Sequence, residues 1–215
     1  MLESTQVRLI LAAERLYAVE GIDRVSLRQI ADASGQRNPA AVQYHFGTKL
    51  ELIRMIVRYR IGPYGQRQIE MCKELDAQGR SLDVRGLVEA SLRPFAELEP
   101  PESHFVRFLA ELTKNPGLYA EVHAGVDDEL LAGSRLLESR LLAALAELPP
   151  ELRELRLRLA INAGLSAIAR AHEQRGGPSA DALPTALLVA DLIETLTAFL
   201  HAPAPVAAGE HLGAR

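Results

Sequence analysis

Residues 26–50 read Ser-Leu-Arg-Gln-Ile-Ala-Asp-Ala-Ser-Gly-Gln-Arg-Asn-Pro-Ala-Ala-Val-Gln-Tyr-His-Phe-Gly-Thr-Lys-Leu. This pattern predicts two short helices around a glycine-containing turn, the arrangement of a helix-turn-helix motif. Ser26 is a favourable N-cap for the first helix, and Gly35 can adopt the left-handed conformation that ends it. Asn38 is the expected N-cap of the second helix. Pro39 suits its first position, where a missing N–H costs nothing.

The second of these helices is predicted to have one face for burial and one for contact. Val42 and Phe46 lie four residues apart and form its apolar stripe. The other face carries small residues and side chains with donors or rings, which suit phosphates and base edges. We expect a DNA-binding surface, with Lys49 on a phosphate, that consists of Ser26, Arg28, Arg37, Asn38, Ala40, Ala41, Gln43, Tyr44, His45 and Lys49. An ordinary pair of packed helices with a polar outer face would show the same spacing.

A longer stretch, roughly residues 4–60, resembles the amino-terminal domain of TetR-type transcriptional regulators. The resemblance is carried by a first helix over about 4–20, Gly21, Val25-Ser26-Leu27, Ile30-Ala31, Gly35 and the run from Val42 to Leu52. Its specific part is the Tyr-His-Phe-Gly-x-Lys core at 44–49, and it is most similar to the subgroup with Asn and two alanines before that core. The turn between Gly35 and Asn38 is one residue longer than in the commonest form of the family. The resemblance implies a DNA-binding regulator and not an enzyme.

Charge and composition agree with this interpretation. The chain has 215 residues and is 48% apolar, enough for a small DNA-binding domain and a larger helical core. Up to Arg60 there are nine Lys and Arg against six Asp and Glu, whereas the remainder has 15 against 22. A basic face can bind nucleic acid although the net charge is −4, because phosphate contacts are local. A lone cysteine and the absence of a signal peptide or a long apolar run indicate a cytoplasmic protein without membrane association.

Helical periodicity continues to the end of the chain, and strand signals are absent. A long helix is expected from Thr48 to about Ala77, kinked at Gly62-Pro63, followed by helices near 82–98, 103–114, 118–148, 151–175 and 181–201. We therefore predict an all-α fold with a three-helix helix-turn-helix DNA-binding domain at 1–47. A helical effector-binding and dimerisation domain is expected at 48–202 and a flexible tail at 203–215.

The last two of these helices are expected to form a homodimer. Small residues at spacings of three or four allow a second helix to approach closely, and the last helix is apolar on more than one face. The expected interface residues are Ala160, Ala163, Gly164, Ala167, Ala171, Leu192, Leu196 and Phe199. A two-fold dimer could place its recognition helices in major grooves about 34–36 Å apart and read a palindrome. Burial of both helices within a monomer is the alternative.

The middle of the chain is expected to bind a small, largely apolar effector. The candidate pocket residues are Tyr64, Met71, Phe95, Phe105, Phe108, Tyr119 and Asn162. Aromatic residues at helical spacing are more often simply part of a core. Effector binding could alter the separation of the two DNA-binding domains at Gly62-Pro63, and a static kink is the alternative.

No catalytic residue, metal or cofactor is predicted. The histidines at 104, 123, 172 and 201 lack the spacing that places two imidazoles on one metal, and Asp127-Asp128-Glu129 suits a helix start. The predicted function is a ligand-responsive regulator, a repressor released from a palindromic DNA operator by its effector, with activation left open. The alternative is an all-helical enzyme or interaction module whose first 60 residues mimic the motif.

Overall fold

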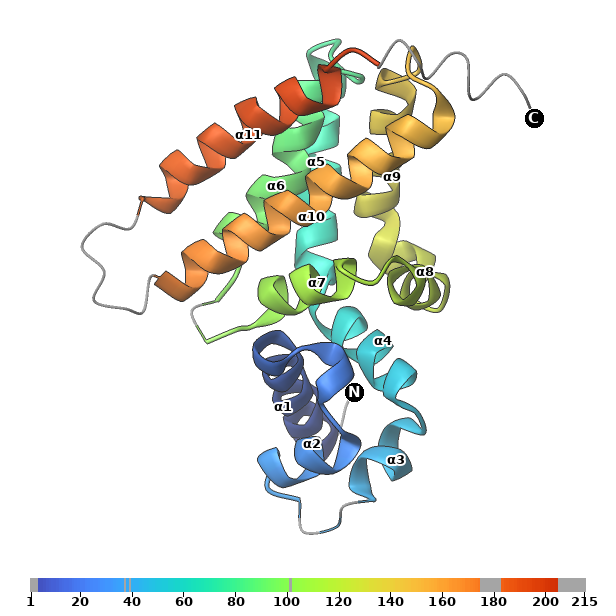
Figure 1. Ribbon diagram of the computed structural model, residues 1–215, viewed down its shortest axis with the longest axis vertical. Coiled ribbons are helices and arrows are strands. Elements are labelled where there is room, and N and C mark those ends of the chain that lie inside the picture. Colours follow the sequence, from blue (N-terminus) through green and yellow to red (C-terminus); the bar gives the residue numbers. More distant parts are fainter. Residues whose placement is uncertain (1–3, 37, 39, 101, 175–182, 205–215) are drawn as a thin grey trace. The chain divides into compact units, whose positions relative to one another are not determined.

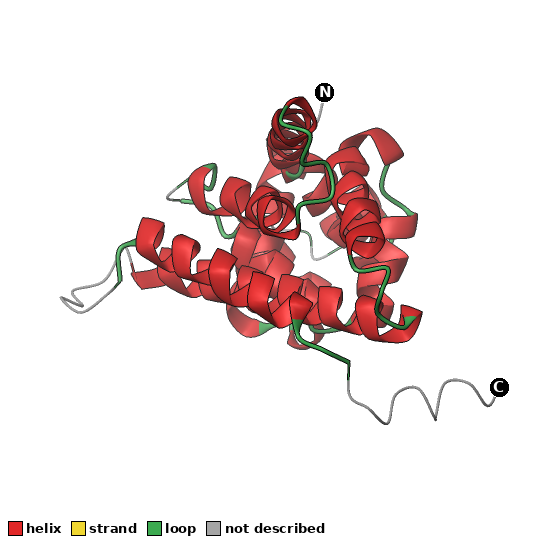
Figure 2. Cartoon of the chain, turned by 90° about the horizontal axis from the view of Figure 1, so that it is seen from above, coloured by secondary structure: helices red, strands yellow, loops and turns green. Residues whose placement is uncertain are grey.

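The computed structural model describes residues 4–36, 38, 40–100, 102–174 and 183–204. These residues form eleven α-helices and one short 3-10 helix and contain no β-strand, so the predicted all-α fold is confirmed (Figures 1 and 2). Arg37, Pro39 and most of the predicted tail lie outside the described residues. The chain forms two compact units: unit 1 draws on residues 1–66 and 98–132, and unit 2 on 67–97 and 133–215.

Unit 1 contains the helix-turn-helix motif. Its helices are α1 (Ser4–Glu20), the 3-10 helix η1 (Ile22–Arg24), α2 (Leu27–Ala33), α3 (Ala41–Phe46), α4 (Lys49–Arg60), α7 (Phe105–Thr113) and α8 (Pro116–Ala124). Helix α1 is central, because it packs against α2, α4 and α7. Leu9, Ile10 and Tyr17 of α1 are fully buried, as expected for the helical face that meets three neighbours.

Unit 2 is built on α6 (Val84–Glu97), with α10 (Pro150–Gln174) and α11 (Thr185–His201) packed against it and against each other. It also contains most of α5 (Gly62–Ala77) and of α9 (Asp128–Ala144), whose first residues belong to unit 1. Arg140 of α9 donates two hydrogen bonds of 2.8 Å to the carboxylate of Asp76 at the end of α5. The functional boundaries at 47/48 and 202/203 remain predictions.

Two helix predictions were wrong. The single kinked helix from Thr48 to Ala77 is in fact two helices, α4 and α5, separated by a bend at Ile61. Pro63 lies in the first turn of α5, where its missing N–H interrupts no helical hydrogen bond. The predicted helix over 118–148 is likewise divided into α8 and α9 at Gly125, where a Cβ atom would lie 2.2 Å from Nε of Arg54.

The remaining boundaries agree with the prediction within two residues, except at the last helix and at the end of α9, which is Ala144 and not 148. That helix was expected from 181, but Leu183 and Pro184 are not helical and α11 begins at Thr185. The proline has an extended ψ of 133°, a conformation that precedes a helix and does not belong to one. Residues 181 and 182 lie outside the described part of the chain.

Candidate nucleic-acid interface

Helix α2 is capped at both ends by the residues that the sequence suggested. Ser26 Oγ accepts the Gln29 N–H at 3.3 Å, and the Gln29 side chain accepts the Ser26 N–H at 2.8 Å, which together form a capping box. Gly35 follows the helix with a φ of 75°. The Gly35 N–H donates to the Asp32 carbonyl at 3.1 Å and the Gln36 N–H to the Ala31 carbonyl at 3.0 Å, the hydrogen bonds of a Schellman motif.

Helix α3 is shorter than predicted, and its N-cap is Ala40, which makes no side-chain capping bond, and not Asn38 as expected. Asn38 Oδ1 accepts the Ala40 N–H at 2.9 Å, and the Asn38 carbonyl accepts the Ala41 N–H at 3.0 Å. This tight first turn precedes the regular helix, which begins at Ala41. Gly47 ends α3 with a φ of 72°, and its N–H donates to the Gln43 carbonyl at 2.9 Å. The turn between α2 and α3 is thus held by the Schellman motif at Gly35 and by the two hydrogen bonds that Asn38 accepts.

The exposed face of α3 carries polar and aromatic groups. Val42 and Phe46 are buried, which confirms the predicted apolar stripe. Gln43 is exposed, Tyr44 is 85% exposed, and the Tyr44 ring meets the half-buried His45 ring edge-on at 5.1 Å. The prediction was wrong for one residue of the DNA-binding surface. Ala41 is buried, because it lies on the same side of this short helix as Val42 and the half-buried His45.

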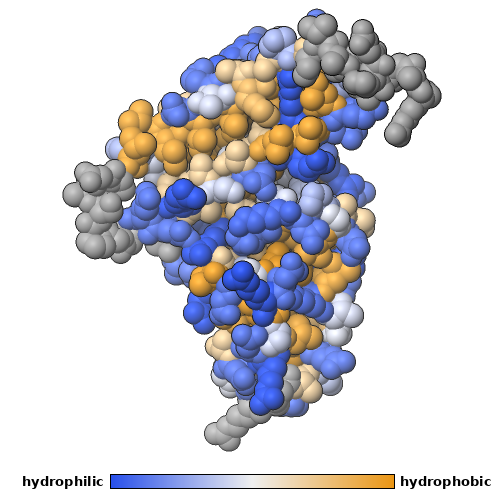
Figure 3. All heavy atoms as spheres, in the orientation of Figure 1, coloured by the Kyte–Doolittle hydropathy of each residue, from blue (hydrophilic) through white to orange (hydrophobic). Residues whose placement is uncertain are grey.

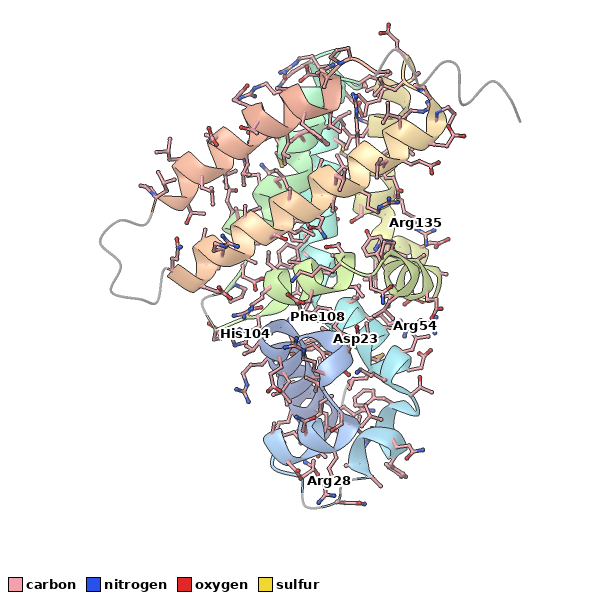
Figure 4. All side chains as sticks on the ribbon, viewed as in Figure 1. Asp23, Arg28, Arg54, His104, Phe108 and Arg135 are labelled. Atoms are coloured by element: carbon pink, nitrogen blue, oxygen red, sulfur yellow. The ribbon has the colours of Figure 1, made fainter. Side chains whose placement is uncertain are left out.

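Other predicted contact residues surround α3. Ser26, Asn38 and Ala40 are exposed. Arg28 is also exposed and projects from α2 at the end of the unit that holds the turn into α3 (Figure 4). A guanidinium at this position is suited to phosphate or to the O6 and N7 atoms of guanine.

Lys49 is directed into the domain and not away from it. Its Nζ donates to the carbonyl oxygens of Ile22 and Val25, the latter at 2.8 Å, and lies 5.5 Å from the centre of the Tyr17 ring. Burial lowers the pKa of Lys49, and the nearby Asp23 opposes that effect. Two of the three ammonium N–H groups therefore bind the segment that leads into α2, so the side chain does not point to a phosphate as expected.

Residues 9–56 match the family model described as bacterial regulatory proteins, tetR family. This segment is similar to the DNA-binding domains of that family. It covers most of α1, the whole helix-turn-helix motif and most of α4, and we call it the tetR-type domain. The match supports a DNA-binding regulator, because the members of that family are transcriptional regulators and not enzymes. No protein with a curated description matches the chain.

Solved structures are also similar to the chain. The fatty acid degradation regulator FadR from Bacillus halodurans is 16% identical with a TM-score of 0.54, and the alignment covers 92% of this chain and 96% of that one. The TetR family regulator PfmR from Thermus thermophilus is 19% identical with a TM-score of 0.49, covering 95% and 100%. A putative TetR-family regulator from Mesorhizobium loti is 18% identical with a TM-score of 0.44, covering 91% and 95%. The FadR likeness shows that the two chains share a fold over nearly their whole length.

The seven predicted pocket residues are divided between the two units. Tyr64, Phe105 and Phe108 are buried in unit 1, where Phe105 lies 5.5 Å from Tyr64 and 6.2 Å from Phe108 between ring centres. These three rings and Tyr17 form a core cluster, with Phe108 beside α1 (Figure 4). The ring of the half-exposed Tyr119 lies 4.1 Å from that of His123, between ring centres, in the same unit. Met71, Phe95 and Asn162 belong to unit 2.

A surface cleft of about 580 Å³ in unit 1 is lined by other residues. It lies where the end of α1 and η1 face the corner between α7 and α8, and none of the seven predicted pocket residues lines it. In the described part of the chain, no group of three or more His, Cys, Asp or Glu side chains could hold a metal ion. No helix among those residues combines the length and apolarity needed to cross a membrane.

Half of the predicted dimer residues are used inside unit 2. Ala160, Gly164, Ala171 and Leu196 are buried there, so their assignment to a surface between two chains was wrong. A Cβ atom at Gly164 would lie 2.4 Å from Cδ2 of Leu92, which shows that the small residues of α10 allow α6 to approach. Ala163 and Phe199 are exposed, and Ala167 and Leu192 are half-buried.

An apolar surface remains exposed on α10 and α11 (Figure 3). It includes Leu155 at 40% exposure and Leu159 at 48% on α10, Leu187 at 54% and Phe199 at 37% on α11, and Leu183 at 59% just before α11. We call these five residues the α10–α11 apolar face. Large apolar side chains gathered on one surface typically mark a binding site.

Sequence reasoning missed a buried ion pair in unit 1. Glu14 of α1 is 1% exposed and accepts hydrogen bonds from Arg60 Nε at 2.7 Å and Nη2 at 3.1 Å. The signal was present in the sequence, because Ile10, Glu14 and Tyr17 fall on one helical face. A carboxylate between two buried apolar residues needs a buried partner.

Proposed function

We propose that the chain is a homodimeric, ligand-responsive repressor that is released from a palindromic DNA operator by a small, largely apolar effector in the cytoplasm. The observation that carries this proposal is the exposed face of α3. Gln43 and Tyr44 project from a helix that Val42 and Phe46 anchor in the core of the tetR-type domain. A recognition helix needs this combination of a fixed backbone and free polar side chains.

Each predicted contact residue is assigned a role by its chemistry. Gln43 reads a base edge through its amide, and Tyr44 contacts a phosphate or a thymine methyl group. Ser26, Arg28, Asn38 and His45 bind the phosphate backbone, together with Arg37, and Ala40 allows the backbone of α3 to approach the groove. Lys49 is now assigned a positioning role, because its ammonium holds the carbonyls of Ile22 and Val25 just before α2.

The α10–α11 apolar face supports the homodimer. The sequence repeats this face in every copy, so a two-fold axis would bring two copies of it together. Leu159 and Leu187 are about half exposed in one chain and would be desolvated in such a pair. A dimer is also what an operator requires, since one six-residue recognition helix makes few base contacts.

The proposed effector is assigned to residues of unit 2. Of the predicted pocket residues, Met71, Phe95 and Asn162 lie in unit 2, which is the unit without the helix-turn-helix motif. Thioether and phenyl groups with one amide suit a small, largely apolar ligand. Such a ligand can weaken operator binding only if it prefers one arrangement of the protein over another.

Selection of duplexes from a random pool tests the DNA-binding half directly. We expect the wild-type chain to enrich a sequence with two-fold symmetry and half-site centres one helical turn apart. Gln43→Ala should cost about 1–3 kcal/mol and relax preference at one position of each half-site. Enrichment of no sequence by a folded wild-type protein would contradict the proposal. Release of the selected duplex by added apolar compounds then tests the effector.

A further inference from the structure

The start of α7 is held by side chains from other segments of unit 1. His104 is the N-cap residue and makes no side-chain capping bond of its own. Its N–H donates instead to Oε1 of Glu14 on α1 at 2.9 Å, and the Val106 N–H donates to Oε1 of Glu99 at 3.2 Å. Two carboxylates thus satisfy free N–H groups at the positive end of this nine-residue helix.

The same two carboxylates hold the residues on either side of the bend between α4 and α5. Glu14 receives both hydrogen bonds from Arg60, the last residue of α4. Glu99 receives the hydroxyl of Tyr64, which lies in the first turn of α5. Between Arg60 and Tyr64 there are three residues, Ile61, Gly62 and Pro63. Each carboxylate therefore joins one side of the bend to the start of α7.

Burial makes this arrangement sensitive to the loss of any one member. Glu14 is 1% exposed and Tyr64 is 4% exposed. Burial and the hydrogen bond to Glu99 raise the pKa of Tyr64, so the hydroxyl stays protonated and donates. A buried charged group is tolerated when all its hydrogen bonds are made and penalised when some are lost, so the contacts are expected to form and break together.

We propose that Glu14, Arg60, Glu99 and Tyr64 form a polar latch that links the bend between α4 and α5 to the start of α7. Because Glu14 belongs to α1 of the tetR-type domain, the latch would link DNA binding to the order of α7, a step that rests on the proposed function. The four side chains are positioning residues. They act through the placement of α1 and α4, whose neighbours α2 and α3 contact the DNA.

The latch is tested first without DNA, by hydrogen exchange of individual backbone amides followed by NMR. Tyr64→Phe removes one hydroxyl and keeps the ring that packs against Phe105. If the contacts are linked, this variant speeds exchange at Val106 and also at His104, whose acceptor is Glu14 and not Glu99. We expect both amides to exchange at least about five times faster. A change confined to Val106 would overturn the latch.

Tyr59→Phe is the matched control. Tyr59 lies on α4, one residue before Arg60, and is 40% exposed. Its substitution by phenylalanine removes a hydroxyl group, as Tyr64→Phe does. In Tyr59→Phe, the amides of His104 and Val106 should exchange at rates within about twofold of wild type. Glu14→Gln should perturb the latch more than Tyr64→Phe, and it is compared with wild type after circular dichroism has shown that it is folded. It should speed exchange at both amides further, and an unchanged Val106 amide would contradict the link.

The second arm adds a duplex selected from the random pool. Binding should slow exchange at His104 and Val106 of the wild-type chain by about fivefold or more, because linkage is reciprocal. Tyr64→Phe should reduce that slowing, and Tyr59→Phe should not. Bound duplex with unchanged exchange at both amides would overturn the link to DNA. If no duplex is bound at all, the proposed function fails, while the first arm still decides whether the latch exists.

Discussion

Unit 1 contains a buried ion pair, whereas unit 2 has an exposed apolar face on two packed helices. In unit 1, Glu14 and Arg60 form an ion pair beneath the surface, and Arg54 donates to the Glu121 carbonyl at 2.8 Å. In unit 2, Leu159 and Leu187 are about half exposed on the α10–α11 apolar face. Directional polar contacts fix one arrangement of helices, while an exposed apolar face is stabilised by a partner. The difference suggests that unit 1 holds a defined geometry and unit 2 provides association.

The largest effect is expected from breaking the buried ion pair. Arg60→Met leaves the Glu14 carboxylate buried without its partner, which should lower the free energy of unfolding by about 3–5 kcal/mol. Arg67→Met is the control, because Arg67 forms exposed ion pairs with Glu70 and Glu74 and should cost less than about 1 kcal/mol. Urea unfolding measures both. Equal losses for the two variants would remove the contrast between buried and exposed charge pairs.

The next effect concerns the α10–α11 apolar face. Leu187→Glu would place a carboxylate in each half of a two-fold interface and weaken dimerisation by about 3 kcal/mol, or more than 100-fold. Leu82→Glu is the matched control, because Leu82 is 52% exposed but lies in the turn before α6. Sedimentation equilibrium should show monomers for the first variant and dimers for the second. A wild-type chain that is already monomeric at micromolar concentration would contradict the association of unit 2.

Local signals explain why the helix-turn-helix motif could be predicted from the sequence. Ser26 with Gln29 forms the capping box, and Gly35 supplies the left-handed residue that ends α2. Each of these features depends on residues within five positions of one another, so sequence spacing is sufficient. The exposure of Gln43 and the burial of Val42 follow from the same short-range periodicity.

Long-range packing explains what the sequence did not reveal. Gly164 and its small neighbours were assigned to a second chain, but α6 of the same chain occupies that groove. Periodicity identifies a helical face that needs a partner and cannot say which helix supplies it. Lys49 was likewise assigned to a phosphate, because the carbonyls of Ile22 and Val25 that receive its ammonium lie 27 and 24 residues earlier.

Lys49 gives the third prediction, which separates positioning from phosphate contact. Lys49→Met removes two hydrogen bonds from a charged donor, so operator affinity should fall by about 1.5–3 kcal/mol for all sequences. Because no phosphate contact is lost, the dependence of affinity on salt should keep its slope. Arg28→Ala provides the comparison and should lower that slope by about 0.9. A similar reduction of the slope in Lys49→Met would show that Lys49 contacts a DNA phosphate after all.

The smallest effect is expected at Tyr17, a residue at which the polar packing of unit 1 is incomplete. Its hydroxyl is buried and makes no hydrogen bond among the described residues. Tyr17→Phe removes that group and keeps the ring beneath Lys49, so at pH 8 the variant should be as stable as wild type or more stable by up to about 1 kcal/mol. A loss of more than about 1 kcal/mol would mean that the hydroxyl has a partner in solution.

The same substitution should change the response to alkali. Burial raises the pKa of Tyr17 in the folded chain above the value of about 10 for an unfolded tyrosine. The folded state therefore retains this proton more tightly, and the associated stability is complete below pH 10 and is lost as the pH rises further. Each such tyrosine adds about 1.4 kcal/mol of destabilisation per pH unit in that range. Tyr17→Phe should remove one such contribution and leave that of Tyr64, whose pKa is also raised. Urea unfolding between pH 8 and 11 measures the two slopes, and parallel curves for wild type and variant would show that Tyr17 ionises equally well in both states.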